Sequence, residues 1–397
     1  MEVSEAPLAG IKVIEFSHMV MGPATGLILA DLGAEVVKIE PLGGDKTRQL
    51  GGSGAGYYPM YNRNKRSVCL DLKSGEGKAV ALELISQADV LIENFRPGAM
   101  ERLGFGYDDC RERHAGLIYC SLKGFLSGPY EKRTALDEVT QMMGGLAYMT
   151  GLPDRPLRAG SSVIDITGGM FGVIAILAAL EERHRTGRGQ RVSSALFETT
   201  AFLVGQHMAQ EGVLGEPPPP MSVRRSAWSI YDIFECAEDG RVFVGVVSDG
   251  LWQRFCDEFG LDELGADPGL AGNTDRVTQR ERILEVIVPL FRGMSVEEAC
   301  ERLERAGIPF APINRPTDLF DDPHLNTGGG LLPVSMHRGV RMGEAVKLPA
   351  LPVEMDGERP ALRRDLARPG EDTLAVLRES GLSEDDIDRL RQAGVIG

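Results

Sequence analysis

The sequence offers little from which a disulfide or a metal site could be built. Its six cysteines are scattered without a Cys-x-x-Cys pair, and its six histidines include no His-x-x-x-His pair. Neither a disulfide framework nor a zinc site is therefore expected, and no metal is assigned. Unpaired cysteines are typical of proteins in a reducing compartment, so the cytoplasm is the expected location.

Signals for membranes and for nucleic acids are equally scarce. The first residues lack the basic start and apolar core of a signal peptide, and no run of eighteen apolar residues exists, so no membrane span is expected. Asp+Glu 58 against Lys+Arg 43 gives a net charge of −15, which argues against sequence-independent nucleic-acid binding. An anionic substrate would therefore need a local cationic pocket.

What the chain does have is the pattern of an α/β protein. Its 397 residues, 43% hydrophobic and 25% charged, leave room for two or three domains. Apolar strands alternate with helical segments, which predicts a large Rossmann-like domain whose mainly parallel sheet is covered on both faces. The predicted strands are 11–16, 35–40, 67–72, 90–93 and 117–120, and the helices between them include 24–32 and 77–87.

A second, smaller α+β domain is expected after the proline run 217–220, which reads as a stiff linker. It begins with a β-hairpin and continues with helices and one short strand. The hairpin is predicted at 231–237 and 242–247, the helices at 251–259, 280–291 and 296–306, and the strand at 308–313. The predicted domains are 1–215, 216–325 and a segment 326–397 that returns to the first domain.

Cationic side chains gather in the loops that follow the predicted strands. Ligands of parallel sheets bind beyond the carboxyl ends of the strands. Each of these cations alone is more simply a solvated surface charge, but together they favour a pocket for a polyanion that carries a flat ring. The cations are Lys46, Arg48, Arg96, Arg102 and Lys123, and the candidates for ring stacking are Phe95 and Phe125.

Asp165 lies where a short β-branched segment, 161–166, is expected to lead into a helix that ends at Gly187. The local sequence favours an N-cap role for Asp165. The alternative is a nucleophile whose charge the free helix N–H groups stabilise, with Gly168 and Gly169 giving an acyl group room to approach. One buried helix face is predicted from the apolar residues Met170, Val173, Ile174, Ile176, Leu177 and Leu180.

The sequence resembles the family III CoA-transferases over nearly its whole length. The matching segments include Glu93-Asn-Phe-Arg-Pro-Gly98 and Thr186-Gly-Arg-Gly-Gln190, and the others are 8–16, 22–23, 30–40, 62–67, 70–72 and 102–104. The resemblance implies an interlocked homodimer that acts on an acyl-CoA and a small carboxylic acid, with no cofactor besides the CoA thioester. It makes Asp165, just ahead of Gly-Gly-Met, the covalent nucleophile.

The resemblance also assigns residues that contact CoA. They are Val20, Leu70, Leu72, Asn94, Phe95 and Arg102, and Lys123 is placed with them. Some members carry an Arg just after the second strand, where this chain has Pro41, so Arg48 or Lys46 would meet the phosphates instead. The glycine-rich lid loop of some members has only 248–250 as a counterpart.

One related group, the α-methylacyl-CoA racemases, moves a proton with a His-Asp pair, and this chain has Leu136-Asp137 at the matching place. Because one proton-transfer partner is missing, a racemase-like isomerase is the weaker alternative. Asp137 either orients substrate or tunes Asp165, or it caps the helix through Met142 and Met143. Both interpretations stay open.

The segment 146–165 is similar to members that handle dicarboxylates of four or five carbons. The resemblance implies a ping-pong reaction through an aspartyl-CoA thioester, and C1–C4 transfer on mesaconyl-CoA is favoured over an intermolecular succinyl-CoA:dicarboxylate transfer. A CoA-binding regulator without catalysis is the non-enzymatic alternative. Candidates for holding the distal carboxylate are Arg63, Arg158, Arg224 and Arg225.

Overall fold

The computed structural model describes residues 6–223 and 226–397. The chain forms two compact units, and each is described here by itself. Unit 1 consists of Met1–Ser222 and Pro323–Gly397, and unit 2 consists of Val223–Asp322. Unit 2 is therefore an insertion in the sequence of unit 1.

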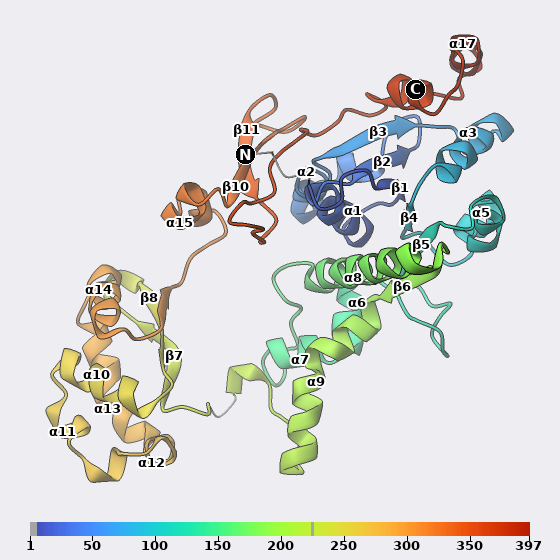
Figure 1. The fold of residues 1–397 in the computed structure, drawn as a ribbon. Coiled ribbons are helices and arrows are strands. Elements are labelled where there is room, and N and C mark those ends of the chain that lie inside the picture. Colours follow the sequence, from blue (N-terminus) through green and yellow to red (C-terminus); the bar gives the residue numbers. More distant parts are fainter. Residues whose placement is uncertain (1–5, 224–225) are drawn as a thin grey trace. The chain divides into compact units, whose positions relative to one another are not determined.

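A six-stranded, entirely parallel sheet forms the centre of unit 1, with the strand order β3-β2-β1-β4-β5-β6 (Figure 1). The strands are β1 (Lys12–Phe16), β2 (Glu35–Glu40), β3 (Lys65–Cys69), β4 (Val90–Glu93), β5 (Ile118–Lys123) and β6 (Arg191–Ala195). The predicted α/β class is confirmed. The sequence analysis did not predict β6.

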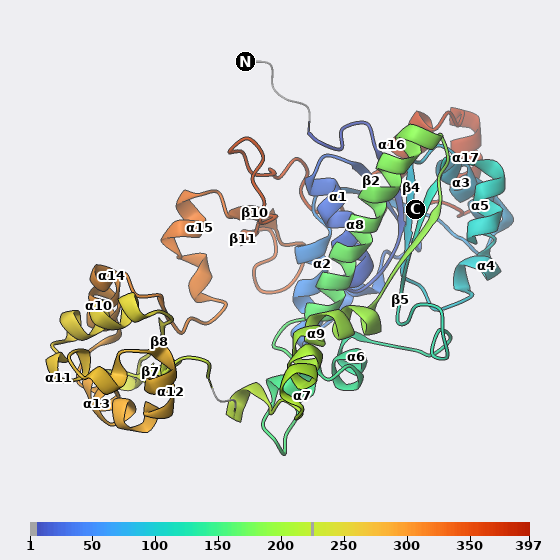
Figure 2. The same ribbon diagram turned by 60° about the horizontal axis from the view of Figure 1, so that its bottom comes forward.

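Helices cover both faces of this sheet because its strands alternate apolar side chains between the two sides (Figures 1 and 2). One face packs against α1 (Met21–Asp31) and α8 (Val163–Thr186). The other packs against α3 (Gly75–Ser86), α5 (Tyr107–Arg113), α16 (Thr373–Glu379) and α17 (Glu384–Gln392). The C-terminal segment thus completes the core on the α3 side.

Unit 1 has further helices besides those that cover the sheet. They include the 3-10 helix η1 (Lys46–Gln49) and the helices α2 (Tyr57–Tyr61), α4 (Ala99–Leu103), α6 (Asp137–Met143), α7 (Leu146–Thr150) and α9 (Leu196–Leu214). After unit 2 the chain continues through α15 (Pro323–Thr327) and the antiparallel pair β10 (Leu331–Ser335) and β11 (Ala345–Pro349).

Unit 2 has the predicted α+β character, because a small antiparallel sheet packs against helices around one apolar core. The sheet, in the order β7-β8-β9, contains β7 (Ile230–Glu235), β8 (Arg241–Val246) and β9 (Phe310–Pro312). The helices are α10 (Asp249–Phe259), α11 (Asp262–Gly265), α12 (Asn273–Thr278), α13 (Arg280–Arg292) and α14 (Val296–Ala306).

Helix α8 departs from two predictions. The predicted strand at 161–166 is wrong, because the helix already begins at Val163. The single buried face is also wrong. Val173, Ile176 and Leu180 are buried against the sheet, whereas Met170, Ile174 and Leu177 are 48%, 59% and 37% exposed. The apolar set therefore covers two faces of α8, and one of them is open to solvent in the single chain.

By length and composition, α8 is the one helix among the described residues that could cross a membrane. The expectation drawn from apolar runs had found no such segment. Core helices of globular proteins pass the same test, and α8 packs along the central sheet beside α1.

Candidate active site

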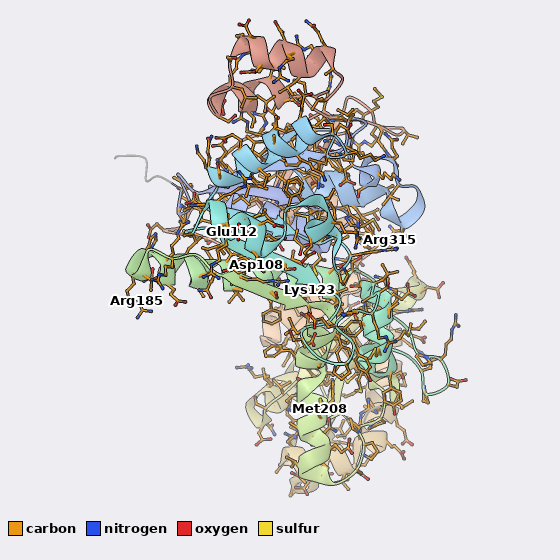
Figure 3. All side chains as sticks on the ribbon, turned by 90° about the vertical axis from the view of Figure 1, so that its right-hand side faces the viewer. Asp108, Glu112, Lys123, Arg185, Met208 and Arg315 are labelled. Carbon is orange, nitrogen blue, oxygen red and sulfur yellow. The ribbon has the colours of Figure 1, made fainter. Side chains whose placement is uncertain are left out.

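Asp165 lies in the first turn of α8, at the carboxyl edge of the sheet. The helix is the crossover between the parallel neighbours β5 and β6, so it must start near the end of β5 and run back along the sheet. Figure 3 shows these two ends, with Lys123 at the end of β5 and Arg185 at the far end of α8. The helix start is therefore brought to the edge where parallel sheets bind ligands.

The N-cap interpretation of Asp165 is wrong, because another carboxylate caps the helix. Ser162 is the residue before α8, and its side chain makes no capping hydrogen bond. Instead, Asp137 Oδ2 accepts the backbone N–H groups of Ile164 at 2.9 Å and of Asp165 at 3.1 Å. An acid at a helix start also interacts favourably with the helix dipole. Asp137 thus caps α8 rather than its own helix, α6.

The other oxygen of Asp137 is held by two side chains. Gln141 Nε2 donates to Asp137 Oδ1 at 2.6 Å, and Arg158 Nη2 donates to the same atom at 3.4 Å. Gln141 Oε1 accepts the N–H of Ala159 at 2.8 Å. We call Asp137, Gln141 and Arg158 the Asp137 clamp, because together they fasten the loop before α8 to α6. The sequence analysis missed Gln141, although its four-residue spacing from Asp137 on a helix was a usable signal.

The carboxylate of Asp165 is half-buried and accepts no hydrogen bond from any residue that the structure describes. Burial, followed by the nearby charge of Asp137, raises its pKa to about 7, and Arg158 opposes that shift. The expectation that helix amides hold its charge is therefore wrong, because Asp137 occupies the amides of residues 164 and 165. A carboxylate without donors is more basic and a better nucleophile.

Tyr61, at the end of α2, faces the same carboxylate. Burial and then the charge of Asp165 raise the pKa of Tyr61 to about 12, so its phenol remains protonated at neutral pH. Tyr57, one turn earlier on α2, has its hydroxyl 3.5 Å from Ser162 Oγ. Two tyrosines of α2 thus lie beside the start of α8. The sequence analysis did not predict this contact.

Gly168 and Gly169 serve helix packing rather than access for an acyl group. A Cβ at Gly168 would lie 2.7 Å from Met21 Cε, and one at Gly169 would lie 2.9 Å from the backbone oxygen of Met21. Thr25 Oγ1 also donates to the carbonyl of Gly169 at 3.1 Å. The glycines let α8 approach α1 closely, so the expected open space above them is absent.

The loops after β1 and β4 are joined at the point where the strand order reverses. The N–H of His18 donates to Asn94 Oδ1 at 3.0 Å, and Asn94 Nδ2 donates to the carbonyl of His18 at 2.9 Å. The His18 ring lies 5.5 Å from the half-buried Phe95 ring. Burial lowers the pKa of His18, so its ring is neutral at pH 7. Such a switch point is where doubly wound sheets bind nucleotides.

The remaining candidates for CoA contact differ in how far their side chains are exposed. Leu72 is half-buried, and Arg102, like Lys46 and Arg96, is exposed. Val20 and Leu70 are each only 1% exposed, so their side chains belong to the core.

Two predicted binding residues are already occupied by other contacts. Arg48 is buried in an ion pair with Glu40 and donates to the carbonyl of Ala367, which contradicts a free phosphate-binding role. Phe125 is 2% exposed and packs against Phe197, with the ring centroids 5.5 Å apart, which contradicts its role as a stacking surface. Lys123 is half-buried, 3.8 Å from Glu131.

Of the two candidate arginines for a distal carboxylate that the structure describes, Arg158 lies beside Asp165. Its side chain is 33% exposed. Arg63 is 1% exposed and paired with Asp31 at 2.7 Å, which contradicts that role. Arg224 and Arg225 lie outside the described residues. The predicted lid segment, 248–250, forms the start of α10 in unit 2.

The chain is similar to known CoA-transferases over most of its length. The model of CoA-transferase family III matches residues 8–373. The succinate–glutarate CoA-transferase of Agrobacterium fabrum is 34% identical over 81% of this chain and 84% of its own length. The acetyl-CoA:oxalate CoA-transferase of Acetobacter aceti is 32% identical over 92% of this chain and 97% of its own length.

Among solved structures, a CAIB/BAIF family protein from Brucella suis superposes with a TM-score of 0.83 at 31% identity, covering 95% of this chain and all of that one. The predicted resemblance is confirmed, because the family model and these relatives match most of the chain. The chain therefore belongs to CoA-transferase family III and is a CoA-transferase that acts between carboxylates.

Proposed function

We propose that Asp165 carries the CoA group as a covalent aspartyl thioester. One observation carries the proposal: the Asp165 carboxylate sits at the carboxyl edge of the sheet without hydrogen-bond donors, while Asp137 caps the helix in its place. A carboxylate held in this state attacks an activated acyl group once the two are brought together.

The reaction runs in two symmetrical halves. An Asp165 oxygen attacks the thioester carbonyl of the donor, so a mixed anhydride forms and CoA leaves as a thiolate. The thiolate then attacks the carbonyl of the Asp165 side chain, which gives the aspartyl-CoA thioester and releases the donor acid. The acceptor carboxylate repeats these steps in reverse, and no net proton is consumed. Covalent catalysis of this kind divides one difficult exchange into easier steps.

The substrates proposed are dicarboxylates of four or five carbons. The name of the succinate–glutarate relative supports this size range, and the partly exposed Arg158 supplies a cation near Asp165 for a second carboxylate. That relative moves CoA between two different acids, which favours the intermolecular reaction. The likeness of segment 146–165 to dicarboxylate enzymes favours the second candidate, C1–C4 transfer on mesaconyl-CoA.

A single assay separates the two candidates. Mesaconyl-C1-CoA is incubated with the enzyme alone, and succinyl-CoA is incubated with added mesaconate or glutarate. Isomerisation without an acceptor identifies the intramolecular reaction, and transfer only with an acceptor identifies the intermolecular one. A racemase-like isomerase gains no support, because Leu136 stands where a proton-transfer histidine is needed.

The covalent step is tested by trapping. The parent enzyme incubated with acyl-CoA and hydroxylamine is expected to acquire a hydroxamate at Asp165, and Asp165→Asn and Asp165→Ala are expected to lose transfer and trapping. Asp154→Asn, at an exposed aspartate in the segment before α8, is the control and should retain both. Near-native turnover by either Asp165 variant, or a parent that binds CoA without being trapped, contradicts the proposal.

We also propose that the protein is a homodimer. Apolar side chains on α8 and α9 are exposed in the single chain, and Met208 projects from α9 in Figure 3. The largest exposed fractions are those of Ile174 59%, Phe202 72%, Met208 67%, Val213 83% and Leu214 61%. A patch of this kind marks a surface that another protein covers. A second copy of the chain is the proposed occupant.

A further inference from the structure

Gln141 is a fully buried amide on α6, one helical turn after Asp137, with an exposed fraction of 0%. Its Nε2 donates to Asp137 Oδ1 at 2.6 Å, and its Oε1 accepts the backbone N–H of Ala159 at 2.8 Å. The side chain therefore connects α6 with the loop that leads into α8.

The two bonds use opposite ends of the amide and so fix its direction. Because Gln141 Oε1 accepts the Ala159 N–H, the NH2 group of the amide must face Asp137. Asp137 therefore accepts a hydrogen bond instead of meeting the amide oxygen, which would repel its carboxylate. Arg158 approaches the same Asp137 oxygen at 3.4 Å. These two donors hold Oδ1, so Oδ2 is the atom that faces the start of α8.

We propose that Gln141 is a positioning residue that orients Asp137 so that Asp137, and not Asp165, caps α8. The inference rests on the proposed function, because it explains why the nucleophile keeps its lone pairs free. Gln141 itself touches no reacting atom.

The charged and titratable groups that face Asp165 come from three elements. They are Asp137 on α6, Arg158 in the loop before α8, and Tyr61 on α2. If Asp137 turned away, the N–H groups at the start of α8 would be left with Asp165 as the nearest remaining carboxylate. Hydrogen bonds from these groups stabilise the ionised carboxylate, so they would make Asp165 more acidic and less nucleophilic.

The test is the pH profile of the full-length variant Gln141→Met, which keeps the length of the side chain but neither donates nor accepts a hydrogen bond as the amide does. We expect kcat to fall about tenfold or more. The acid limb of the kcat/KM profile, which reports ionisation of the free enzyme, should move to lower pH by about one unit. A merely structural role would lower the rate equally at every pH and leave the limb in place.

Thr140→Val is the matched control. Thr140 is the neighbouring residue, is equally buried, and its hydroxyl donates only to the carbonyls of Leu136 and Asp137 within or at the start of α6. The acid limb of the kcat/KM profile of Thr140→Val should coincide with that of the parent enzyme. A shift as large as that of Gln141→Met would mean that any defect in α6 moves the limb, which overturns the assignment to Gln141.

Arg158→Lys is the second variant, and it decides the question if Gln141→Met does not fold. Lysine keeps the positive charge, which itself lowers the pKa of Asp165, but lacks the guanidinium whose Nη2 lies 3.4 Å from Asp137 Oδ1. The weaker hold on Asp137 predicts a smaller shift of the acid limb to lower pH. An unmoved limb in the folded variants overturns the inference. If the parent itself is not trapped at Asp165 by hydroxylamine, the proposed function fails; if it is trapped while the limb stays in place, only this inference fails.

Discussion

At position 165 the protein keeps a carboxylate in surroundings that do not favour its charge. Burial and the neighbouring Asp137 raise the pKa of Asp165 to about 7, and no described residue donates a hydrogen bond to it. In the proposed mechanism this arrangement favours acyl transfer, and it makes the folded state less stable at neutral pH. Removing the charge should therefore stabilise the protein while it abolishes activity.

Asp165→Asn is expected to raise the free energy of unfolding at pH 8 by about 1 to 2 kcal/mol, because each unit of pKa shift corresponds to about 1.4 kcal/mol and water screens part of a half-buried charge. The folded pKa, about 7, lies above the ordinary 3.8. Between these values the folded carboxyl keeps a proton that the unfolded chain has released. Parent stability therefore falls as pH rises through this window and remains lowered above it.

Urea unfolding at pH 5 and pH 8, at one fixed protein concentration, measures this difference. The advantage of Asp165→Asn over the parent should be larger at pH 8 than at pH 5. Asp154→Asn, at an exposed position, should follow the parent at both values. Equal stability of Asp165→Asn and the parent at pH 8 would show that Asp165 has no raised pKa.

At the scale of helices and strands, the close contact of α8 with α1 depends on glycines, which have no side chain. A Cβ at Gly169 would lie 2.9 Å from the backbone oxygen of Met21, which no rotamer change can relieve. Gly169→Ala should therefore destabilise the protein by about 1 to 3 kcal/mol. Gly250→Ala, in α10 with no atom within 4 Å of the new Cβ, should be neutral or stabilise by up to about 1 kcal/mol.

Thermal or urea unfolding of the two variants provides the measurement, and transfer activity shows whether the start of α8 has moved. Because the added methyl group must push the two helices apart, activity should fall in Gly169→Ala even where the protein remains folded. If Gly169→Ala is as stable and as active as the parent, the close approach of the helices does not matter.

The strands could be predicted where apolar residues run continuously, as in β2 and β4, because both faces of these strands are buried. The edge strand β6, Arg191–Ala195, was missed because only its end is buried and its pairing with β5 is what identifies it. The start of α8 was misplaced because Val163, Ile164 and Ile166 favour a strand locally. The cap that overrides this preference comes from Asp137, far away in the sequence.

The candidate site was predictable where one residue type carries a role by itself. Asp165 stood out through the motif around it, and Asn94 and Phe95 through the loop after a strand. Partners brought by tertiary packing were not predictable. Nothing in the sequence shows that Arg48 pairs with Glu40, or that Gln141 faces the loop before α8.

For the molecule as a whole, the exposed apolar residues of α8 and α9 should be covered by a second chain. Phe202 and Met208 are 72% and 67% exposed, and charge at an apolar interface strongly disfavours association. The double variant Phe202→Glu/Met208→Glu is expected to sediment as a monomer, or to dissociate at concentrations where the parent is dimeric.

Val340→Glu is the control, because Val340 is fully exposed in the turn between β10 and β11, away from α8 and α9 in the sequence. It should leave the sedimentation of the parent unchanged. A parent that is monomeric at micromolar concentration would show that the apolar surface is not closed by a second copy.

The interruption of unit 1 by unit 2 has a consequence during synthesis. Unit 2 is one uninterrupted stretch, so it can close its core as soon as it leaves the ribosome. Unit 1 cannot, because α16 and α17 complete the α3 side of its sheet and are translated after unit 2. Until then Val68 and Leu84 stay accessible on the nascent chain, which makes this face the natural place for a chaperone to bind.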